Sequence, residues 1–385
     1  MSEQPSLFSA FALHTQTALA VLPNRAEVLA QLPAALESWF PSVARSLPWR
    51  NTHDPYAIWV SEVMLQQTQV STVLPYYLRF MEALPTVAAL AQAEEAVVLK
   101  LWEGLGYYSR ARNLQKAAKV VVNEHQGQWP TTKQGWLQLP GVGDYTAGAI
   151  LSFAFKQRQP LVDGNVKRVL ARLCDEDRDI KSTEADKQFW AWATELSETC
   201  TDIWTFNQAI MELGATVCTP ANPSCGVCPV NHTCLALANN TVDQRPVVVA
   251  KAPVPHKHIG VAVIQNAEGH YFVQQRPAEG LLAGLWEFPG GKQEANEPLE
   301  LTVRREIKEE LGWDVAVEQH LLNVSHAYSH FKVTLHVYQC LLGDDAPEPV
   351  LRAAQAARWL PLSELRLLPF PKANIKILDF LEAQV

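Results

Sequence analysis

The sequence predicts a multidomain protein in which an all-α region is followed by a separate α+β domain. From about residue 32 to 217, apolar residues recur three and four positions apart, and segments end at Pro or Gly. This is the pattern of helices with one buried face, and we expect about ten of them. Four cysteines crowd between 218 and 234. Beyond about 258, β-rich runs mix with helical stretches, which indicates a second core.

Length and composition set the outer limits of the fold. The 385 residues are 48% hydrophobic, which is enough for two or three ordinary domains. The formal charge of −8 argues against a protein that coats DNA nonspecifically, because such binding depends on neutralising phosphates. The sequence lacks a run of about eighteen apolar residues and the basic start of a secretory signal. We therefore expect a cytoplasmic protein without a membrane partner.

The helical region is predicted to span 32–236, after an N-terminal extension at 1–31 to which we assign no function. Within it, the segment from Tyr107 to Lys119 carries four positive charges, no negative charge and two tyrosines. Two interpretations are equally supported by this segment alone. It suits a phosphate backbone, and it also suits a solvated helix face.

The cysteine loop has the spacing C-x6-C-x2-C-x5-C. Structural zinc usually takes two short pairs of ligands, and here only the central pair has that form. Four thiolates in one compact loop suit a 4Fe-4S cluster, whose larger core needs ligands spread around it. The pattern favours the cluster over zinc. The candidate ligands are Cys218, Cys225, Cys228 and Cys234.

A Gly-Val-Gly turn at Gly141–Gly143 joins two helical segments. Glycine allows the backbone to approach a ligand closely, and the helix that follows offers free N–H groups to a phosphate. A plain helix-helix turn is the alternative for this motif by itself. Next to the cysteine loop, a DNA-binding hairpin is the better interpretation.

Two carboxyl groups in different surroundings predict glycosidic bond cleavage. Glu62 lies in a segment that is apolar on nearly every face upstream, and burial would raise its pKa so that it holds a proton near neutral pH. Asp163 immediately precedes a predicted helix, which it would cap and whose N-terminus would keep its carboxyl ionised. An acid for the leaving group and an anion for a cationic sugar are what such a reaction requires. The alternatives are a surface glutamate and a simple helix cap.

The C-terminal domain is predicted at 258–385, after an interdomain linker at 237–257 that contains Pro246, Pro253 and Pro255. Strands are expected at 259–264, 271–273 and 333–338, and helices at 299–311 and 372–382. Residues 291–313 match the Nudix box G-x5-E-x7-R-E-U-x-E-E-x-G-U at every fixed position. Helical spacing puts Glu306, Glu309 and Glu310 on one face, where carboxylates can bind Mg²⁺ or Mn²⁺.

Together these motifs resemble the A/G-specific adenine DNA glycosylase family, MutY, over roughly 32–385, with a helix-hairpin-helix fold of the endonuclease III superfamily. The resemblance implies a monomeric DNA repair enzyme that acts on duplex DNA containing adenine opposite 8-oxoguanine or guanine. It implies that Glu62 protonates the adenine and that Asp163 stabilises the sugar cation or bonds to it. The supporting residues implied at the active site and on DNA are Tyr145, Asn165, Gln67, Tyr107, Gly141, Gly143 and Lys167.

Two features refine this expectation. Relatives that resemble endonuclease III and also cut the strand carry a lysine at the hairpin position occupied here by Tyr145, and a phenol cannot form a Schiff base. We therefore expect base excision without an efficient lyase step. The segment His326–His330 resembles the family's Phe-Ser-His lesion loop with Tyr for Phe, which makes Ser329 the residue expected to bind 8-oxoguanine.

The complete Nudix box departs from the family pattern, in which the metal box has decayed. Two interpretations of the C-terminal domain are open. One is lesion recognition over a box retained from ancestry. The other is a second activity, the hydrolysis of an oxidised nucleoside triphosphate.

Overall fold

The computed structural model describes residues 24–249, 253–328, 331–343 and 345–384. Its contacts divide the chain into two compact units. The first unit combines Met1–Ala44 with Val162–Val248, and the second combines Arg45–Leu161 with Val249–Val385. Each unit is therefore assembled from two separate stretches of sequence.

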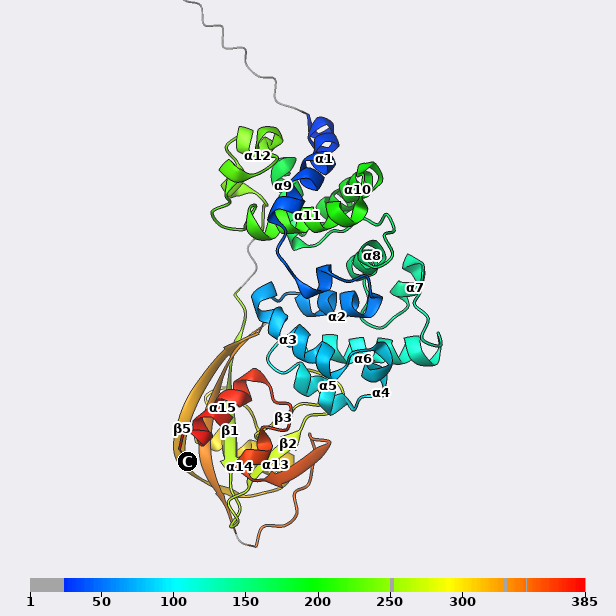
Figure 1. Cartoon of the computed structure of the whole chain (residues 1–385). Coiled ribbons are helices and arrows are strands. Elements are labelled where there is room, and N and C mark those ends of the chain that lie inside the picture. Colours follow the sequence, from blue (N-terminus) through cyan, green and yellow to red (C-terminus); the bar gives the residue numbers. More distant parts are fainter. Residues whose placement is uncertain (1–23, 250–252, 329–330, 344, 385) are drawn as a thin grey trace, which may run out of the picture. The chain divides into compact units, whose positions relative to one another are not determined.

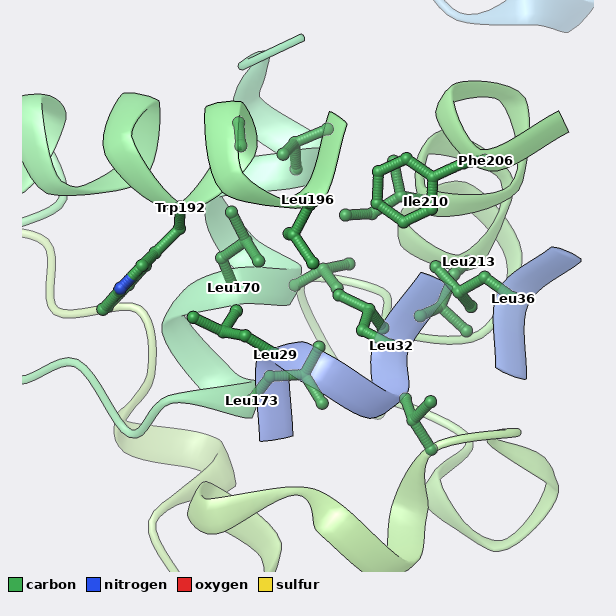
Figure 2. Packing of buried hydrophobic residues seen from close by; sticks show 14 of the residues in the cluster. Leu29, Leu32, Leu36, Leu170, Leu173, Trp192, Leu196, Phe206, Ile210 and Leu213 are labelled. Atoms are coloured by element: carbon green, nitrogen blue, oxygen red, sulfur yellow. The ribbon is translucent and has the colours of Figure 1, made fainter. Parts of the chain in front are cut away.

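The first unit is a helical bundle around one apolar core. Its longer helices are α1 (Arg25–Val43), α9 (Gly164–Leu173), α10 (Thr183–Thr199) and α11 (Ile203–Thr216). Each presents an apolar stripe to the others, as the leucines of α1 and α9 do against Leu196, Phe206 and Ile210 (Figure 2). Helix α1 begins inside the segment predicted as an extension. It starts there because Asn24 and Glu27 form a reciprocal capping box and Val28 and Leu29 are buried.

The predicted linker also begins within this unit. The short helix α12 (Leu235–Ala238) and a 3₁₀ turn at Val242–Gln244 follow the cysteine loop. The backbone carbonyls of Val242 and Arg245 accept hydrogen bonds from buried Arg172, at 3.3 and 2.9 Å. The first part of the linker is thus held on the helical bundle.

The helical part of the second unit surrounds a nearly all-apolar helix, α2 (Pro55–Leu65), in which Tyr56–Met64 are all buried. Asp54 caps this helix by accepting a hydrogen bond from the Tyr56 N–H, and Pro55 occupies its first turn. The other helices are α3 (Val70–Ala83), α4 (Val87–Gln92), α5 (Glu95–Leu101), α6 (Ser109–Asn123), α7 (Lys133–Leu137) and α8 (Asp144–Phe153).

The C-terminal domain of the second unit is built on two sheets (Figure 1). One sheet has the strand order β4-β1-β6-β5, and the other has the order β3-β2-β7. Strand β1 runs parallel to β6 and antiparallel to β4. The strands are β1 (His256–Ile264), β2 (Tyr271–Gln275), β3 (Trp286–Glu287), β4 (Gly290–Lys292), β5 (Val315–Ala327), β6 (Lys332–Leu342) and β7 (Ala356–Leu360).

Both faces of β1 are buried, in two different cores. Val261 and Val263 join a core that includes residues of α15 (Lys372–Glu382). Ala262 and Ile264 join another that includes α13 (Leu299–Leu311). A further short helix, α14, spans Leu362–Leu365. The two helices predicted for this domain have the observed bounds, and the α+β fold class is confirmed. Across the described residues of both units, every helix is too short or too polar to cross a membrane.

Candidate active site and cysteine loop

Glu62 lies on the buried helix α2, with 5% of its surface exposed. The hydroxyl of Tyr145, at the start of α8, donates a hydrogen bond of 2.9 Å to its Oε2. Glu62 is buried together with its helix neighbours from Tyr56 to Met64, so it is not a surface glutamate. The structure therefore brings together two residues that are 83 positions apart in sequence and that were both predicted as site residues.

Asp163 caps helix α9, as the sequence predicts. Its Oδ1 accepts a 2.7 Å hydrogen bond from the N–H of Val166, and its Oδ2 accepts a 2.9 Å hydrogen bond from the side-chain amide of Asn165. These two donors fix both carboxylate oxygens. Asp163 and Asn165 belong to the first unit, whereas Glu62 and Tyr145 belong to the second.

Opposing effects act on the pKa of Asp163. Burial raises the pKa of its carboxyl above the ordinary value of 3.8, although the hydrogen bonds from Val166 and Asn165 and the charge of Arg168 lower it. Desolvation disfavours the charged form and is the largest of these effects. Burial therefore opposes the stabilisation of the anion by the hydrogen bonds at the start of α9.

Arg168 is a site residue that the sequence analysis missed. Its Nη2 donates to Asn165 Oδ1 at 2.8 Å and to the Gly214 carbonyl at 2.7 Å, and its Nε donates to the Cys218 carbonyl at 2.8 Å. Because Asn165 Oδ1 is occupied by this guanidinium, the amide nitrogen of Asn165 must face Asp163. The only sequence signal was an arginine three residues after Asn165 on the same helix.

Gly214 allows this arrangement. A Cβ added to Gly214 on α11 would lie 2.7 Å from the Cβ of Asn165, which is closer than real side chains approach. The absence of a side chain lets α9 and α11 pack closely at the point where Asn165 faces Asp163.

The four cysteines of the loop all line one hollow in the first unit. Its remaining lining is mostly apolar and includes Val169, Leu213 and Val230. Buried Arg172 holds one side of the loop, with its Nη1 donating to Cys218 Sγ at 3.4 Å and to the Thr219 carbonyl at 2.7 Å. Within the described residues, no three His, Cys, Asp or Glu side chains converge as they would around one ion. Four cysteine thiols that line one hollow fit an iron-sulfur cluster, which is held by four such ligands.

The hairpin glycines have different surroundings. Gly141 has a φ of +76°, and a Cβ there would lie 2.6 Å from the Cβ of Asn113 on α6. The turn therefore requires glycine at 141. Gly143 precedes α8, and a Cβ added to it would meet no heavy atom of the described residues within 4 Å. Open space at Gly143 leaves the backbone accessible to a ligand.

The other predicted DNA-contacting residues lie in several places. Gln67 and Tyr107 are exposed and have left-handed backbones, with φ of +56° and +48°. Lys167 forms an ion pair with Asp186. Ser329 lies outside the described residues.

Only some of the positive charges between Tyr107 and Lys119 are exposed. Lys116 and Lys119 are exposed on α6. Arg110, in contrast, is 9% exposed and its guanidinium is directed at backbone carbonyls of the protein. The sequence could not distinguish these two kinds of positive charge.

Arg305 lies at the centre of the Nudix box. The Arg305 guanidinium holds both oxygens of Glu297 at 2.9 and 3.0 Å, and its Nη1 donates to Glu306 and Glu309 at 3.0 Å. Glu310 accepts instead from Gln274 on β2 at 2.9 Å, and burial raises its pKa to about 7. The box is thus a network of carboxylates centred on one arginine.

Family models match both parts of the chain. Residues 60–195 match the model of the HhH-GPD superfamily of base excision DNA repair proteins, and residues 260–380 match that of the NUDIX domain. Fold and matches together define a base excision repair protein with an appended NUDIX domain. Among curated proteins, the chain is 38% identical to the human adenine DNA glycosylase, with 91% of this chain and 74% of that protein covered.

A yeast relative gives the same result. The adenine DNA glycosylase of Schizosaccharomyces pombe is 34% identical, and the match covers 75% of this chain and 73% of that protein. Among solved structures, a thermostable thymine-DNA glycosylase has a TM-score of 0.49 and 26% identity, with 56% of this chain and 98% of that chain covered. The chain belongs to the adenine DNA glycosylase family.

Proposed function

We propose that this enzyme hydrolyses the N-glycosidic bond of adenine paired with 8-oxoguanine or guanine in duplex DNA. The observation that carries this proposal is the contrast between two carboxyl groups. Glu62 is buried on the mostly apolar helix α2 and accepts a hydrogen bond from the Tyr145 phenol, whereas Asp163 is a helix N-cap that accepts hydrogen bonds on both oxygens. The burial of Glu62 suits a proton donor, and the hydrogen bonds to both oxygens of Asp163 reduce the cost of its anion.

In the proposed reaction, Glu62 gives its proton to the adenine ring while the bond between the base and the sugar breaks. The electron pair of that bond leaves with the base, and positive charge develops on the sugar. The Asp163 carboxylate stabilises this cation or bonds transiently to the anomeric carbon, and water completes the hydrolysis. Tyr145 orients Glu62, and Asn165 orients Asp163, through the hydrogen bonds described above.

Adenine must leave the base stack before either carboxyl group can reach the bond. We propose that Gln67 and Tyr107 enter the vacated stack, which is supported by their exposure and their left-handed backbones. The Gly141–Gly143 turn and the start of α8 would hold a phosphate. Lys167 would contribute positive charge near the DNA.

We propose a 4Fe-4S cluster on Cys218, Cys225, Cys228 and Cys234. The position of these four thiols in the lining of one hollow supports it. With four protein ligands the cluster supplies no open position for substrate, so it would act as a structural centre or an electron carrier. Two arginines of this chain hold the loop in place. Arg172 binds the loop backbone, and Arg168 binds both the Cys218 carbonyl and the side chain of Asn165.

The C-terminal domain, 258–385, is proposed to recognise the lesion through the loop that contains Ser329, while 32–236 carries the excision chemistry. A second candidate function for this domain is Mg²⁺- or Mn²⁺-dependent hydrolysis of an oxidised nucleoside triphosphate. The observation that favours it is the intact box. Glu306 and Glu309 accept hydrogen bonds from Arg305, and Glu310 accepts one from Gln274. Release of pyrophosphate or phosphate from 8-oxo-dGTP with Mg²⁺, abolished by Glu309→Gln with Glu310→Gln, would establish this second activity.

Single-turnover excision tests the main proposal. Duplexes that carry adenine opposite 8-oxoguanine, guanine or thymine should be processed in that order of rate. Glu62→Gln and Asp163→Asn should each abolish adenine release while leaving DNA binding measurable, because each variant keeps the shape of the side chain. Release of adenine at the parent rate by both variants would overturn the proposal.

A further inference from the structure

Arg110, at the start of α6, makes an unusual number of contacts for one side chain. Six oxygen atoms of the second unit lie within hydrogen-bond distance of its two Nη atoms, and only 9% of the residue is exposed. Burial lowers its pKa to about 10, so the guanidinium stays cationic at neutral pH. A buried cation with this many acceptors has a single orientation, because the planar guanidinium is rigid.

Three of these acceptors terminate helix α2. Nη1 donates to the carbonyls of Val63 and Met64 at 2.9 Å each and of Gln66 at 2.5 Å. The last carbonyls of a helix have no intrahelical partner and carry partial negative charge, which a cation stabilises. Arg110 therefore fixes the end of the helix that carries Glu62.

The same guanidinium reaches both sides of Gln67. In addition to the Gln66 carbonyl, Nη2 donates to the Thr68 hydroxyl at 3.3 Å. Gln67 itself has a φ of +56°, a conformation that costs a non-glycine residue about 1–2 kcal/mol. The contacts on its two neighbours hold it in that conformation.

The segment before α6 is bound in the same way. Nη2 donates to the carbonyls of Leu105 and Gly106 at 3.2 and 3.1 Å, and the guanidinium carbon lies 5.4 Å from the ring centroid of Tyr107. Tyr107 also has a left-handed backbone. The buried side chain of Arg110 thus holds the neighbours of both Gln67 and Tyr107, two exposed residues with left-handed backbones.

We propose that Arg110 is the positioning residue that sets the separation of Gln67 and Tyr107, so that both side chains enter the base stack together when adenine leaves it. The inference rests on the proposed function, in which these two residues replace the extruded base. Arg110 does not touch DNA in this role. A lysine would keep the charge but offers three donors on a flexible chain in place of five in a fixed plane, so it cannot hold both segments.

The test distinguishes an effect on the extrusion of adenine from an effect on the bond-breaking step. Arg110→Lys, Gln67→Ala and Tyr107→Ala are assayed in single turnover on two duplexes, one with adenine opposite 8-oxoguanine and one with adenine opposite an abasic site. Extrusion costs less from the second duplex, because its adenine is unpaired. Arg366→Lys, which alters an arginine paired with Asp379 and Glu382 in the C-terminal domain, is the matched control.

We expect Arg110→Lys to slow excision from the paired duplex by about tenfold, with a clearly smaller effect on the abasic duplex, in the same pattern as Gln67→Ala and Tyr107→Ala. Equal slowing on both duplexes would assign Arg110 to the support of Glu62 or of the fold and would overturn the inference. Parent rates on both duplexes would also overturn it.

A second measurement separates this inference from the proposed function. Binding to a duplex with 2-aminopurine next to the target adenine should increase fluorescence in the parent and less in Arg110→Lys. Fluorescence reports unstacking without catalysis. A parent protein that unstacks DNA but releases no adenine would contradict the proposed function, while the ratio of the two fluorescence changes would still decide the role of Arg110.

Discussion

The charge of Asp163 depends on two opposing effects of its position. As the N-cap of α9 it accepts hydrogen bonds from Val166 and Asn165, and as a buried carboxyl it loses solvation. The net result is a raised pKa. A carboxylate that is costly to ionise gains more from a nearby cation than a solvated one does, because the surrounding medium screens the attraction less. Such a group is suited to stabilising a charged sugar.

This predicts an acid limb in the pH-rate profile at a higher pH than an ordinary aspartate would give. Asp163 acts as an anion, so excision should fall as the pH drops through its raised pKa. Removing the Asn165 amide should move the limb to still higher pH, because that hydrogen bond lowers the pKa of Asp163. The measurement is the single-turnover rate of Asn165→Ala and of the parent as a function of pH.

Tyr145→Phe provides the comparison for this profile. It removes the hydrogen bond to Glu62 and leaves the donors to Asp163 in place. We expect it to lower the rate about tenfold without moving the acid limb. An acid limb that shifts equally in both variants would assign it to a group other than Asp163.

A related prediction concerns strand cleavage. With Tyr145 at the hairpin position, the purified enzyme should release adenine much faster than it cuts the strand, because a phenol forms no Schiff base. Product strands resolved with and without alkali treatment measure the two steps. Cleavage as fast as base release, without alkali or heat, would contradict the prediction.

At the scale of elements, substitutions at the two glycines of the hairpin should affect different properties, one the stability of the fold and the other the affinity for DNA. Gly141→Ala combines a positive φ with a clash against Asn113, and it should destabilise the second unit by about 1–2 kcal/mol. Gly143→Ala should leave stability nearly unchanged, because a Cβ there meets no described atom within 4 Å, while lowering affinity for duplex DNA. Thermal denaturation and DNA titration measure the two effects. Equal thermal shifts in the two variants would refute this division.

Glu297 lies just before helix α13 and pairs with Arg305 on that helix, which makes part of the stability of the C-terminal domain depend on pH. The hydrogen bonds from Arg305 lower the pKa of this carboxyl from 4.5 to about 2. Because the folded pKa lies below the unfolded one, the contribution is present above pH 4.5 and is lost as the pH falls toward 2. Urea unfolding at several pH values should therefore show a weaker acid dependence in Glu297→Gln than in the parent. An unchanged dependence would show that Glu297 has no such role.

The elements that the sequence predicted best are those with strict periodicity. The helices at 299–311 and 372–382 were predicted with the observed bounds. Strand β5 was not predicted, because register shifts at Val317/Gln319 and His320/Leu322 break its alternation. The start of α1 was placed too late, because its capping box lies before the first clear apolar stripe.

The candidate site divides in the same way. Glu62, Asp163 and the cysteines were predicted because carboxyl and thiol groups in these sequence contexts indicate particular chemical roles. Arg110 and Arg168 could not be predicted, because their partners are backbone carbonyls that distant segments supply. A sequence gives no signal for such an acceptor, since every residue has one.

At the scale of the whole molecule, the cysteine loop should govern the stability of the first unit alone. Cys228→Ser should reduce bound iron and lower the thermal transition of that unit by about 5 °C or more, because a cluster contributes to folding when it binds only the folded state. Cys200→Ser, at the end of α10, should retain iron. Elemental analysis with calorimetry measures both effects. Full iron content in Cys228→Ser would contradict the proposed ligand set.

The first unit takes α1 from one end of its sequence and its other helices from beyond residue 161. During synthesis on the ribosome, α1 is made before α9–α11. Its apolar stripe of Leu29, Leu32 and Leu36 therefore has no packing partner until those helices are made. Translation proceeds at about 5–20 residues per second, so the stretch from Leu36 to the end of α11 takes on the order of 10–35 seconds, and the stripe stays uncovered for that time. A nascent chain stalled before residue 162 should accordingly be a target for chaperones, whereas one stalled beyond residue 217 should not.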